Sequence, residues 1–217
     1  MELRNPPENE SLTDRLVRYR QDPFAFASEC VYTHDPKDRN NPIKPYPYDK
    51  EYLRLYCKIW MHERLVLIPK SRRLFMSWQN VILYTWDTMF FVGRHNAFVS
   101  KKEADADSLI ERSKFIIDNI PPSRLPPEVI PAHKKTYTLL EFPGLMSKIQ
   151  AFPSGSDQLR MHGFSGIFND EMAFQDEAEG MYGATYPTIE NGGRFTACSS
   201  AAKGFFHDLV HDLLEQS

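Results

Sequence analysis

The sequence predicts an α/β fold in which a mostly parallel sheet is flanked by helices. Residues 65–68 form a short apolar run that is typical of a buried strand, and a long apolar helix is expected over 78–91. Residues 96–100 have the character of a second strand, followed by a helix over 103–119. This alternation implies a parallel sheet, because each helix carries the chain back to the start of the next strand.

Composition and charge limit the classes of protein to which the chain can belong. Its 217 residues suit one large domain, or one domain with a small appendage, and 41% are hydrophobic, enough for a sizeable core. The net charge of −3 excludes a globally basic nucleic-acid binder, so any DNA contact must use a local patch or a ring lumen. The 3 widely separated cysteines predict neither a disulfide framework nor a zinc site, and they fit a reducing compartment.

The sequence shows neither a signal peptide nor a membrane span. Residues 1–13 are polar and lack the apolar centre of a signal sequence. The longest apolar region, residues 75–92, contains Ser77, Gln79, Asn80 and Asp87, which is typical of a buried core helix. We therefore expect no membrane contact.

The chain is expected to divide into an N-terminal extension, residues 1–48, which packs on a main domain of residues 49–217. The elements expected before the first core strand are helices over 11–20, 24–31 and 49–62, with an extended proline-rich connector over 33–48. Those expected after residue 120 are a proline-rich loop over 123–135, strands over 136–142, 148–152 and 194–199, and helices over 176–183 and 204–215. The first two of these strands are expected to form a hairpin, because Pro143 and Gly144 separate them.

A basic turn joins the first core strand to the helix that follows it. The residues of this turn and of the helix start are Lys70, Ser71, Arg72, Arg73, Leu74, Phe75, Met76, Ser77 and Trp78. Free backbone N–H groups and the dipole of a helix N-terminus favour an anion, and the basic side chains strengthen that preference, so a polyphosphate is the expected ligand. The phosphate-loop pattern G-x-x-x-x-G-K-[ST] fits poorly, because Met76 replaces its lysine and Phe75 its glycine. An ordinary basic turn between strand and helix is the alternative.

Two adjacent acids, Asp170 and Glu171, follow a second short apolar run about 100 residues later. In phosphate-loop enzymes an aspartate at such a strand end holds Mg²⁺. A neighbouring glutamate can deprotonate the attacking water. The alternative is structural, with Asp170 capping the turn at residues 172–174. The basic turn and the acid pair, in this order, are more informative together than either is alone.

These motifs resemble those of the ATPase motor domain of the large terminase subunit of tailed bacteriophages. Residues 70–78 resemble the divergent Walker A motif of that family, in which a basic residue lies earlier in the loop than the usual lysine. Residues 167–171 resemble its Walker B motif with the catalytic glutamate, and residues 196–200 its coupling motif without the common proline. Arg160, ahead of Walker B, resembles an arginine finger of some members. The resemblance covers about residues 46–200.

The resemblance implies ATP hydrolysis that drives double-stranded DNA into a viral procapsid, with ATP and Mg²⁺ bound at residues 70–78. Ser77 and Asp170 would hold Mg²⁺, Glu171 would activate water, and Arg160 would act on a neighbouring subunit's nucleotide. It also implies a homo-oligomeric ring, a portal protein and a small terminase subunit as partners, and action in the host cytoplasm. Members also carry a nuclease domain, which is expected to be absent from these 217 residues.

Several alternatives stay open from the sequence. A helicase-like or other DNA-translocating ATPase shares the paired acids, and a non-catalytic nucleotide- or DNA-binding module would explain Phe75 and Met76. Tyr46 and Tyr48 precede the phosphate loop, where they can meet an adenine ring or merely pack against the next helix.

Overall fold

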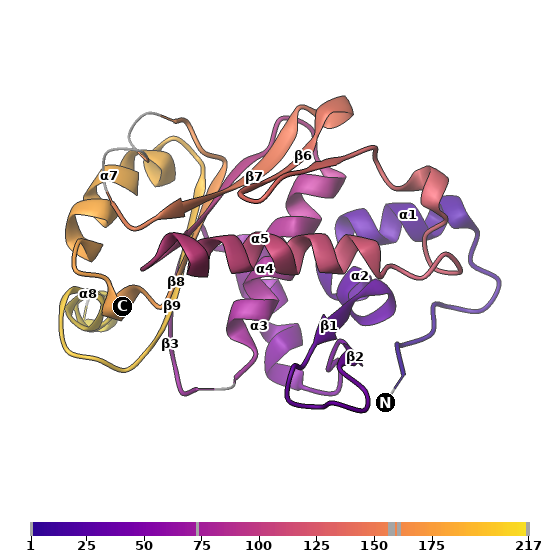
Figure 1. Ribbon diagram of the computed structural model, residues 1–217, viewed down its shortest axis with the longest axis horizontal. Coiled ribbons are helices and arrows are strands. Elements are labelled where there is room, and N and C mark those ends of the chain that lie inside the picture. The colour runs from indigo at the N-terminus through magenta and orange to yellow at the C-terminus, as the bar shows by residue number, and fades with distance from the viewer. Residues whose placement is uncertain (1, 73, 156–158, 160–161, 216–217) are drawn as a thin grey trace.

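The structure is a computed structural model that describes residues 2–72, 74–155, 159 and 162–215. Seven strands form the main sheet in the order β3-β9-β8-β4-β7-β6-β5, and its first four strand pairs are parallel. Helices α1 to α5 cover one face, while α7 and α8 cover the other (Figure 1). The predicted α/β class, with a mostly parallel sheet, is therefore confirmed.

The N-terminal region contributes helices and a small hairpin to the first face of the sheet. Its elements are α1 (Leu12–Gln21), α2 (Pro23–Cys30), β1 (Tyr32–His34) and β2 (Ile43–Pro45), followed by α3 (Glu51–His62). Ser11 caps α1 by accepting the N–H of Asp14, so this helix begins one residue later than predicted. The expected extended connector instead folds back on itself, because β1 and β2 pair antiparallel.

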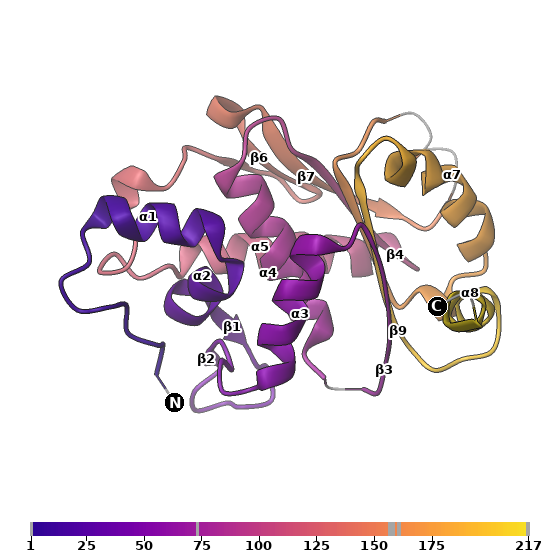
Figure 2. The same cartoon turned by 180° about the vertical axis from the view of Figure 1, so that it is seen from behind.

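The N-terminal region shares one hydrophobic core with the helices of the main domain. Buried Tyr19, Phe24 and Tyr46 belong to the same cluster as Leu53 and Trp86. The indole N–H of Trp86 donates to the backbone carbonyl of Tyr19 at 2.6 Å. Seen from behind, α1, α2 and α3 lie on the same side of the sheet (Figure 2). The N-terminal segment thus packs as part of the body that supports the sheet.

The central elements alternate strand and helix as expected. They are β3 (Leu65–Lys70), α4 (Met76–Phe90), β4 (His95–Ser100) and α5 (Glu103–Asp118). Helix α4 starts two residues earlier than predicted, so Ser77 is its second residue. Buried polar groups line α4 between its apolar residues, and none of the described helices is long and apolar enough to cross a bilayer.

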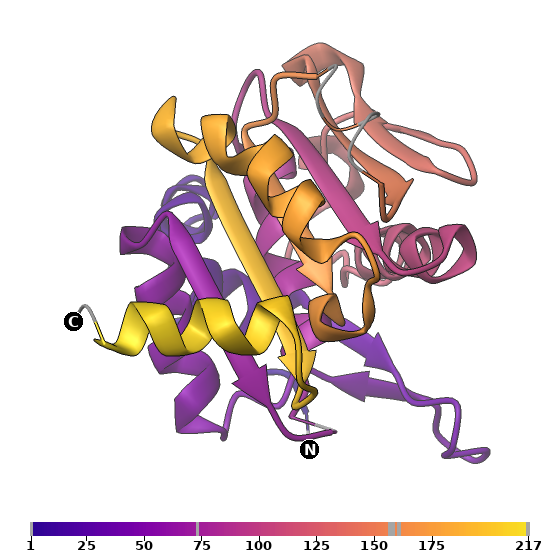
Figure 3. The ribbon, with the colours of Figure 1, turned by 90° about the vertical axis from the view of Figure 1, so that its left-hand side faces the viewer.

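The second half of the chain completes the sheet and covers its other face. The strands are β5 (Lys134–Lys135), β6 (Leu139–Phe142), β7 (Ser147–Pro153), β8 (Gly166–Asp170) and β9 (Arg194–Ser200). The helices are α7 (Ala178–Glu190) and α8 (Phe205–Glu215), which lie in front of the strands in Figure 3. The predicted hairpin is confirmed, since β6 and β7 pair antiparallel.

Two expectations for this half need correction. The loop expected over residues 123–135 ends in a strand, because Lys134 and Lys135 pair with β6. Helix α7 runs seven residues past its expected end at residue 183, to Glu190, although it contains Pro187.

Candidate active site

Three neighbouring strands bring the basic turn and the two acids to one edge of the sheet. Strand β9 lies between β3 and β8 and pairs parallel with both. Lys70, the last residue of β3, lies opposite Ser200, whereas Asp170, the last residue of β8, lies opposite Cys198. Because all three carboxyl ends point the same way, groups about 100 residues apart in sequence meet there.

The turn after β3 leads into a helix N-terminus that no side chain caps. Residue Phe75 precedes the first helical residue, Met76, and makes no capping hydrogen bond. The first backbone N–H with a helical acceptor is that of Gln79, which donates to the Phe75 carbonyl at 2.9 Å. The N–H groups of the first turn are thus oriented for an anion, and the dipole of a 15-residue helix adds to the attraction.

Phe75 occupies the position at which the standard phosphate loop has glycine, and its backbone explains why that loop prefers glycine. Its φ of 63° and ψ of 0° place it in the left-handed region, which costs a residue with a Cβ roughly 1–2 kcal/mol. The ring packs edge-on against buried Tyr46, with centroids 5.9 Å apart. This packing holds the strained residue in place.

Tyr46 therefore supports the loop from within the core. It is 0% exposed, and its hydroxyl donates to the side-chain oxygen of Gln79 at 2.8 Å. A ring with no exposed face has no surface for a base, so of the two interpretations left open by the sequence, packing is favoured for Tyr46. Tyr48 is half-buried at the margin of the same core.

Asp170 faces the N-terminus of α4. Its Oδ1 accepts a hydrogen bond from Ser77 Oγ at 2.8 Å and one from Cys198 Sγ at 3.0 Å. The turn over residues 172–174 has Glu171 as its N-cap residue and no side-chain cap. The alternative in which Asp170 caps that turn is therefore wrong, and the carboxylate is directed at the helix that begins with the basic turn.

Glu171 is held by groups from two other strands. Its Oε1 accepts from Lys70 Nζ at 2.7 Å, and its Oε2 accepts from the Ser200 N–H at 3.1 Å and from Ser199 Oγ at 3.3 Å. Burial alone would raise the pKa of this carboxyl, but the Lys70 ammonium and the hydrogen bonds from β9 lower it below its usual value. Glu171 is therefore ionised at neutral pH. Its φ of 53° is also left-handed, so it projects differently from a strand residue.

Lys70 belongs to the strand end and pairs with an acid. Its side chain is only 7% exposed, and Glu171 is its ion-pair partner. Burial disfavours the charged amine, but the Glu171 carboxylate overcomes that effect and raises the pKa of Lys70. Lys70 is thus a fixed cation between the basic turn and the acids.

A comparison with solved structures finds proteins with a similar fold. The crystal structure of the HK97 bacteriophage large terminase matches with a TM-score of 0.65 at 12% identity, over 91% of this chain and 41% of that one. The chain has the fold of a phage large terminase. The match supports the predicted fold, a mostly parallel sheet flanked by helices.

Two further structures are more distant. The Thermus phage P74-26 large terminase ATPase domain has a TM-score of 0.46 at 15% identity, over 67% of this chain and 62% of that one. A large terminase from a thermophilic bacteriophage also has a TM-score of 0.46, at 16% identity over 72% of this chain and 39% of that one. The chain thus spans less than two thirds of each of these three proteins. No family model matches the sequence, and no curated protein matches it.

The remaining predicted site residues differ in how exposed they are. Ser71, Arg72 and Leu74 are exposed in the turn, and the Leu74 carbonyl accepts from Tyr52 Oη at 3.1 Å. Met76 is buried, and Trp78 is half-buried beside Ser77. Two other predicted residues, Arg73 and Arg160, lie outside the described residues.

The fold brings to the site two residues that were not predicted as site residues, although Cys198 lies within the motif over residues 196–200. Cys198 contacts Asp170 from the middle strand, and burial next to that carboxylate raises the pKa of its thiol. Arg112, on α5, lines the same cavities as Ser77 and Glu171. Arg112 belongs to no local pattern, and it reaches the site only through the packing of α5 on the sheet. The contact of Cys198 with Asp170 depends on the order of the strands.

Proposed function

We propose that this chain is the ATP-hydrolysing domain of a DNA-packaging terminase motor. The observation that supports it most is the hydrogen bond between Ser77 Oγ and Asp170 Oδ1 at 2.8 Å. It joins the start of a phosphate-binding helix to the acid at the end of a core strand, beside an ionised glutamate. A non-catalytic module has no need of this combination.

The residues of the site fit Mg²⁺. A serine hydroxyl and a carboxylate are hard oxygen donors, the type that Mg²⁺ prefers, and Mg²⁺ is usually held by one or two such groups together with the substrate phosphates. Ser77 and Asp170 would hold the ion, which neutralises phosphate charge when bound. Among the described residues there is no group of three or more histidine, cysteine or acidic side chains that could hold a metal ion by itself.

Glu171 is the proposed general base. It is ionised, it lies next to Asp170, and its side chain is 37% exposed, so water can reach it. In the structure its Oε1 is occupied by Lys70. We propose that phosphate oxygens compete for Lys70, so nucleotide binding releases the carboxylate to accept a proton from the attacking water.

The packaging role extends this proposal to an assembly. Lys70, Arg72 and Arg73 are proposed phosphate contacts, and Arg160 is proposed to reach the nucleotide of a neighbouring subunit in a homo-oligomeric ring. The proposed partners are double-stranded DNA, a portal protein and a small terminase subunit, and the proposed place of action is the host cytoplasm. The fold shared with the HK97 large terminase supports this role.

ATP turnover by the purified chain tests the proposal. We expect Mg²⁺-dependent hydrolysis that Ser77→Ala reduces strongly, because the variant loses one donor of the ion and its bond to Asp170. Ser28→Ala is a matched control, since that serine of α2 donates to the Ala25 carbonyl at 3.2 Å and lines neither cavity of the site. Equal turnover in the wild type and Ser77→Ala would remove Ser77 from the site. A chain that binds ATP without Mg²⁺-dependent turnover would favour the non-catalytic module, and unwinding of duplex DNA would favour a helicase.

A further inference from the structure

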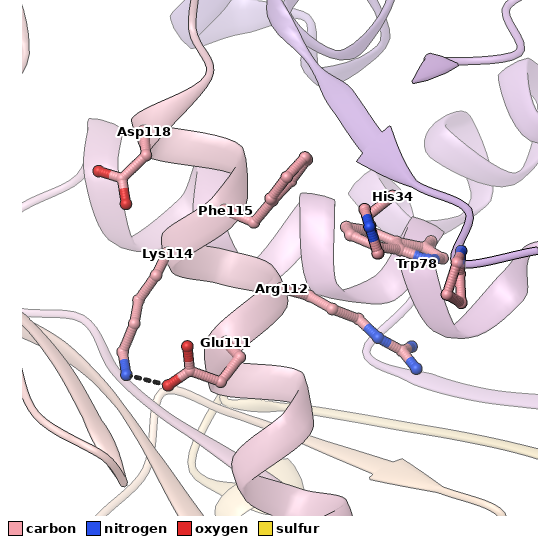
Figure 4. A pocket seen from close by; sticks show the side chains of 8 residues that line it. His34, Trp78, Glu111, Arg112, Lys114, Phe115 and Asp118 are labelled. Atoms are coloured by element: carbon pink, nitrogen blue, oxygen red, sulfur yellow. Dashed lines mark hydrogen bonds and ion pairs between the residues drawn. The ribbon is translucent and has the colours of Figure 1, made fainter. Parts of the chain in front are cut away.

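Arg112 lies in the middle of α5 and points toward the start of α4. Its guanidinium carbon lies 5.3 Å from the centre of the Trp78 ring, the residue next to Ser77. Figure 4 shows Arg112 extending toward Trp78, whereas Glu111 and Lys114 of the same helix turn toward each other and form an ion pair. Phe115 also packs edge-on against the Trp78 ring, with centroids 6.2 Å apart. Arg112 is thus held in one direction by aromatic packing.

Within the described part of the chain, Arg112 has no anionic partner. The half-buried Arg18 and Arg94 each pair with a carboxylate, Glu29 and Asp87 respectively, at 2.8 Å. For Arg112 the described residues offer neither a hydrogen bond nor an ion pair. Burial lowers the pKa of its guanidinium, and the charge of Asp170 offsets this only in part. Arg112 is itself only half-buried, so its guanidinium loses part of its hydration, and an anionic ligand would offset that loss.

The position of Arg112 indicates which part of a nucleotide it faces. It lines a cavity of about 330 Å³ together with Lys70, Ser77 and Glu171. It also lines a second cavity of about 430 Å³ with Asp170, Glu171 and Ser200. The first cavity is bordered by the start of α4, and the second is bordered by both Asp170 and Glu171. Arg112 thus borders the space at the proposed Mg²⁺ donors and the proposed base, as well as the neighbouring cavity drawn in Figure 4.

We propose that Arg112 contacts the terminal phosphate of ATP within its own subunit, supplying charge that the phosphate loop lacks at Met76. This inference rests on the proposed function. A guanidinium can make two parallel hydrogen bonds to phosphate oxygens, which an ammonium cannot. Because the diphosphate lacks the terminal group, Arg112 makes the site select ATP over ADP.

The test compares three variants for binding of ADP and of a non-hydrolysable ATP analogue, by calorimetry with Mg²⁺. Arg112→Met keeps an apolar stem over Trp78 and removes the charge. Arg112→Lys keeps the charge and loses the fork. Arg20→Met is the matched control, since Arg20 stacks on Phe91 at a similar 5.2 Å and lines neither of the two cavities.

We expect Arg112→Met to weaken the ATP analogue about 10- to 100-fold, the range for hydrogen bonds to charged groups, and to leave ADP within about twofold. Arg112→Lys should restore part of the loss. Arg20→Met should match the wild type for both nucleotides. Without nucleotide, Arg112→Met should unfold at a temperature no lower than that of the wild type, because the packing over Trp78 is retained and an unpaired charge is removed.

The outcomes separate this inference from the proposed function. Equal weakening of ADP and of the analogue in Arg112→Met, or no weakening of either, overturns the contact with the terminal phosphate while ATP binding by the wild type upholds the site. A lower unfolding temperature with no preferential loss of the analogue assigns Arg112 to packing alone. If the wild type binds neither nucleotide, the proposed function itself fails, and the inference fails with it.

Discussion

Lys70 and Arg112 are two cations that approach the same acids from different parts of the molecule, and only Lys70 is paired. Lys70 ends strand β3 and gives its charge to Glu171 at 2.7 Å, whereas Arg112 projects from α5 over Trp78 without a carboxylate partner among the described residues. We call the strand side of the site, at Lys70, closed, because a carboxylate already neutralises its cation. We call the helix side, at Arg112, open, because the described residues leave its cation without a carboxylate. The difference suggests that binding of a polyphosphate fills the open side and loosens the closed one.

The largest expected effect concerns a third cation, Arg160. An arginine supplied to a neighbour's nucleotide accelerates phosphoryl transfer by about 10³–10⁵-fold, so Arg160→Ala should be nearly inactive. Glu171→Gln should also be nearly inactive, because it lacks the proposed general base. A mixture of the two proteins should recover turnover, because an intact finger from one subunit can serve an intact base in the next.

The mixing experiment also tests the comparison between strand side and helix side. If Arg112 serves its own subunit, a mixture of Arg112→Met with Glu171→Gln should recover less turnover than the Arg160→Ala mixture. Each mixture is measured at protein concentrations over which the turnover of the wild type depends on concentration. Absence of recovery under those conditions would rule out a trans role for Arg160.

Glu171→Gln alone should give the next largest effect. It keeps the shape of the side chain and removes the base, so hydrolysis should fall about 10²–10⁴-fold while ATP binding is retained. Because Lys70 also loses its ion-pair partner, the variant should bind ATP at least as tightly as the wild type. Glu179→Gln, an exposed residue of α7, is the control. Near-normal turnover in Glu171→Gln would place the base elsewhere.

Lys70→Met should change both the rate and its pH dependence. Lys70 helps to lower the pKa of Glu171, and a carboxylate with a lower pKa stays ionised further into acid. Without Lys70 the pKa of Glu171 rises, so the acid limb of kcat/KM should move to higher pH. The plateau rate should also fall, roughly 10- to 100-fold, if Lys70 also binds phosphate.

A paired lysine outside the site provides the control for this profile. Lys44, on β2, pairs with Asp38 at 2.5 Å, so Lys44→Met removes a similar ion pair. Its acid limb should coincide with that of the wild type. An unshifted limb in Lys70→Met would mean that Glu171 is not the group that titrates in the rate.

The fold and half of the site could be predicted from the sequence because both depend on local patterns. Apolar runs bounded by polar turns indicated the core strands, and the order of basic turn and acid pair identified Ser77 and Asp170. The left-handed Phe75 could not be foreseen, because only Tyr46 packing explains how a side chain replaces glycine there. The burial of Tyr46 is likewise decided by tertiary packing, which periodicity does not report.

The other half of the site depends on topology. The Lys70–Glu171 pair requires β9 to lie between β3 and β8, with the strand ends in the observed register. Arg112 carries no motif, and its role depends on α5 packing beside the start of α4. Residues on separate elements of this kind can be found only once the strand order is known.

The smallest expected effect on hydrolysis concerns the middle strand. Ser199 Oγ donates to Glu171 Oε2 at 3.3 Å and accepts the Ala173 N–H at 3.1 Å, so it links the acid to the turn that leads to α7. The Ser200 contact with Glu171 uses a backbone N–H, which survives substitution. Ser199→Ala with Ser200→Ala should therefore slow ATP hydrolysis only a few-fold.

DNA translocation should suffer more in this double variant, measured in a complete packaging system. The proposed reason is that Ser199 transmits the state of the nucleotide from Glu171 to the turn that leads to α7. Hydrolysis itself does not need this step. Ser28→Ala is the control, because that buried serine of α2 donates only to the Ala25 carbonyl at 3.2 Å. Equal loss of hydrolysis and translocation would instead identify residues 196–200 as a plain core strand. Loss of translocation alone would show that the closed, strand side of the site couples the motor, while Arg112 on the open side serves the nucleotide.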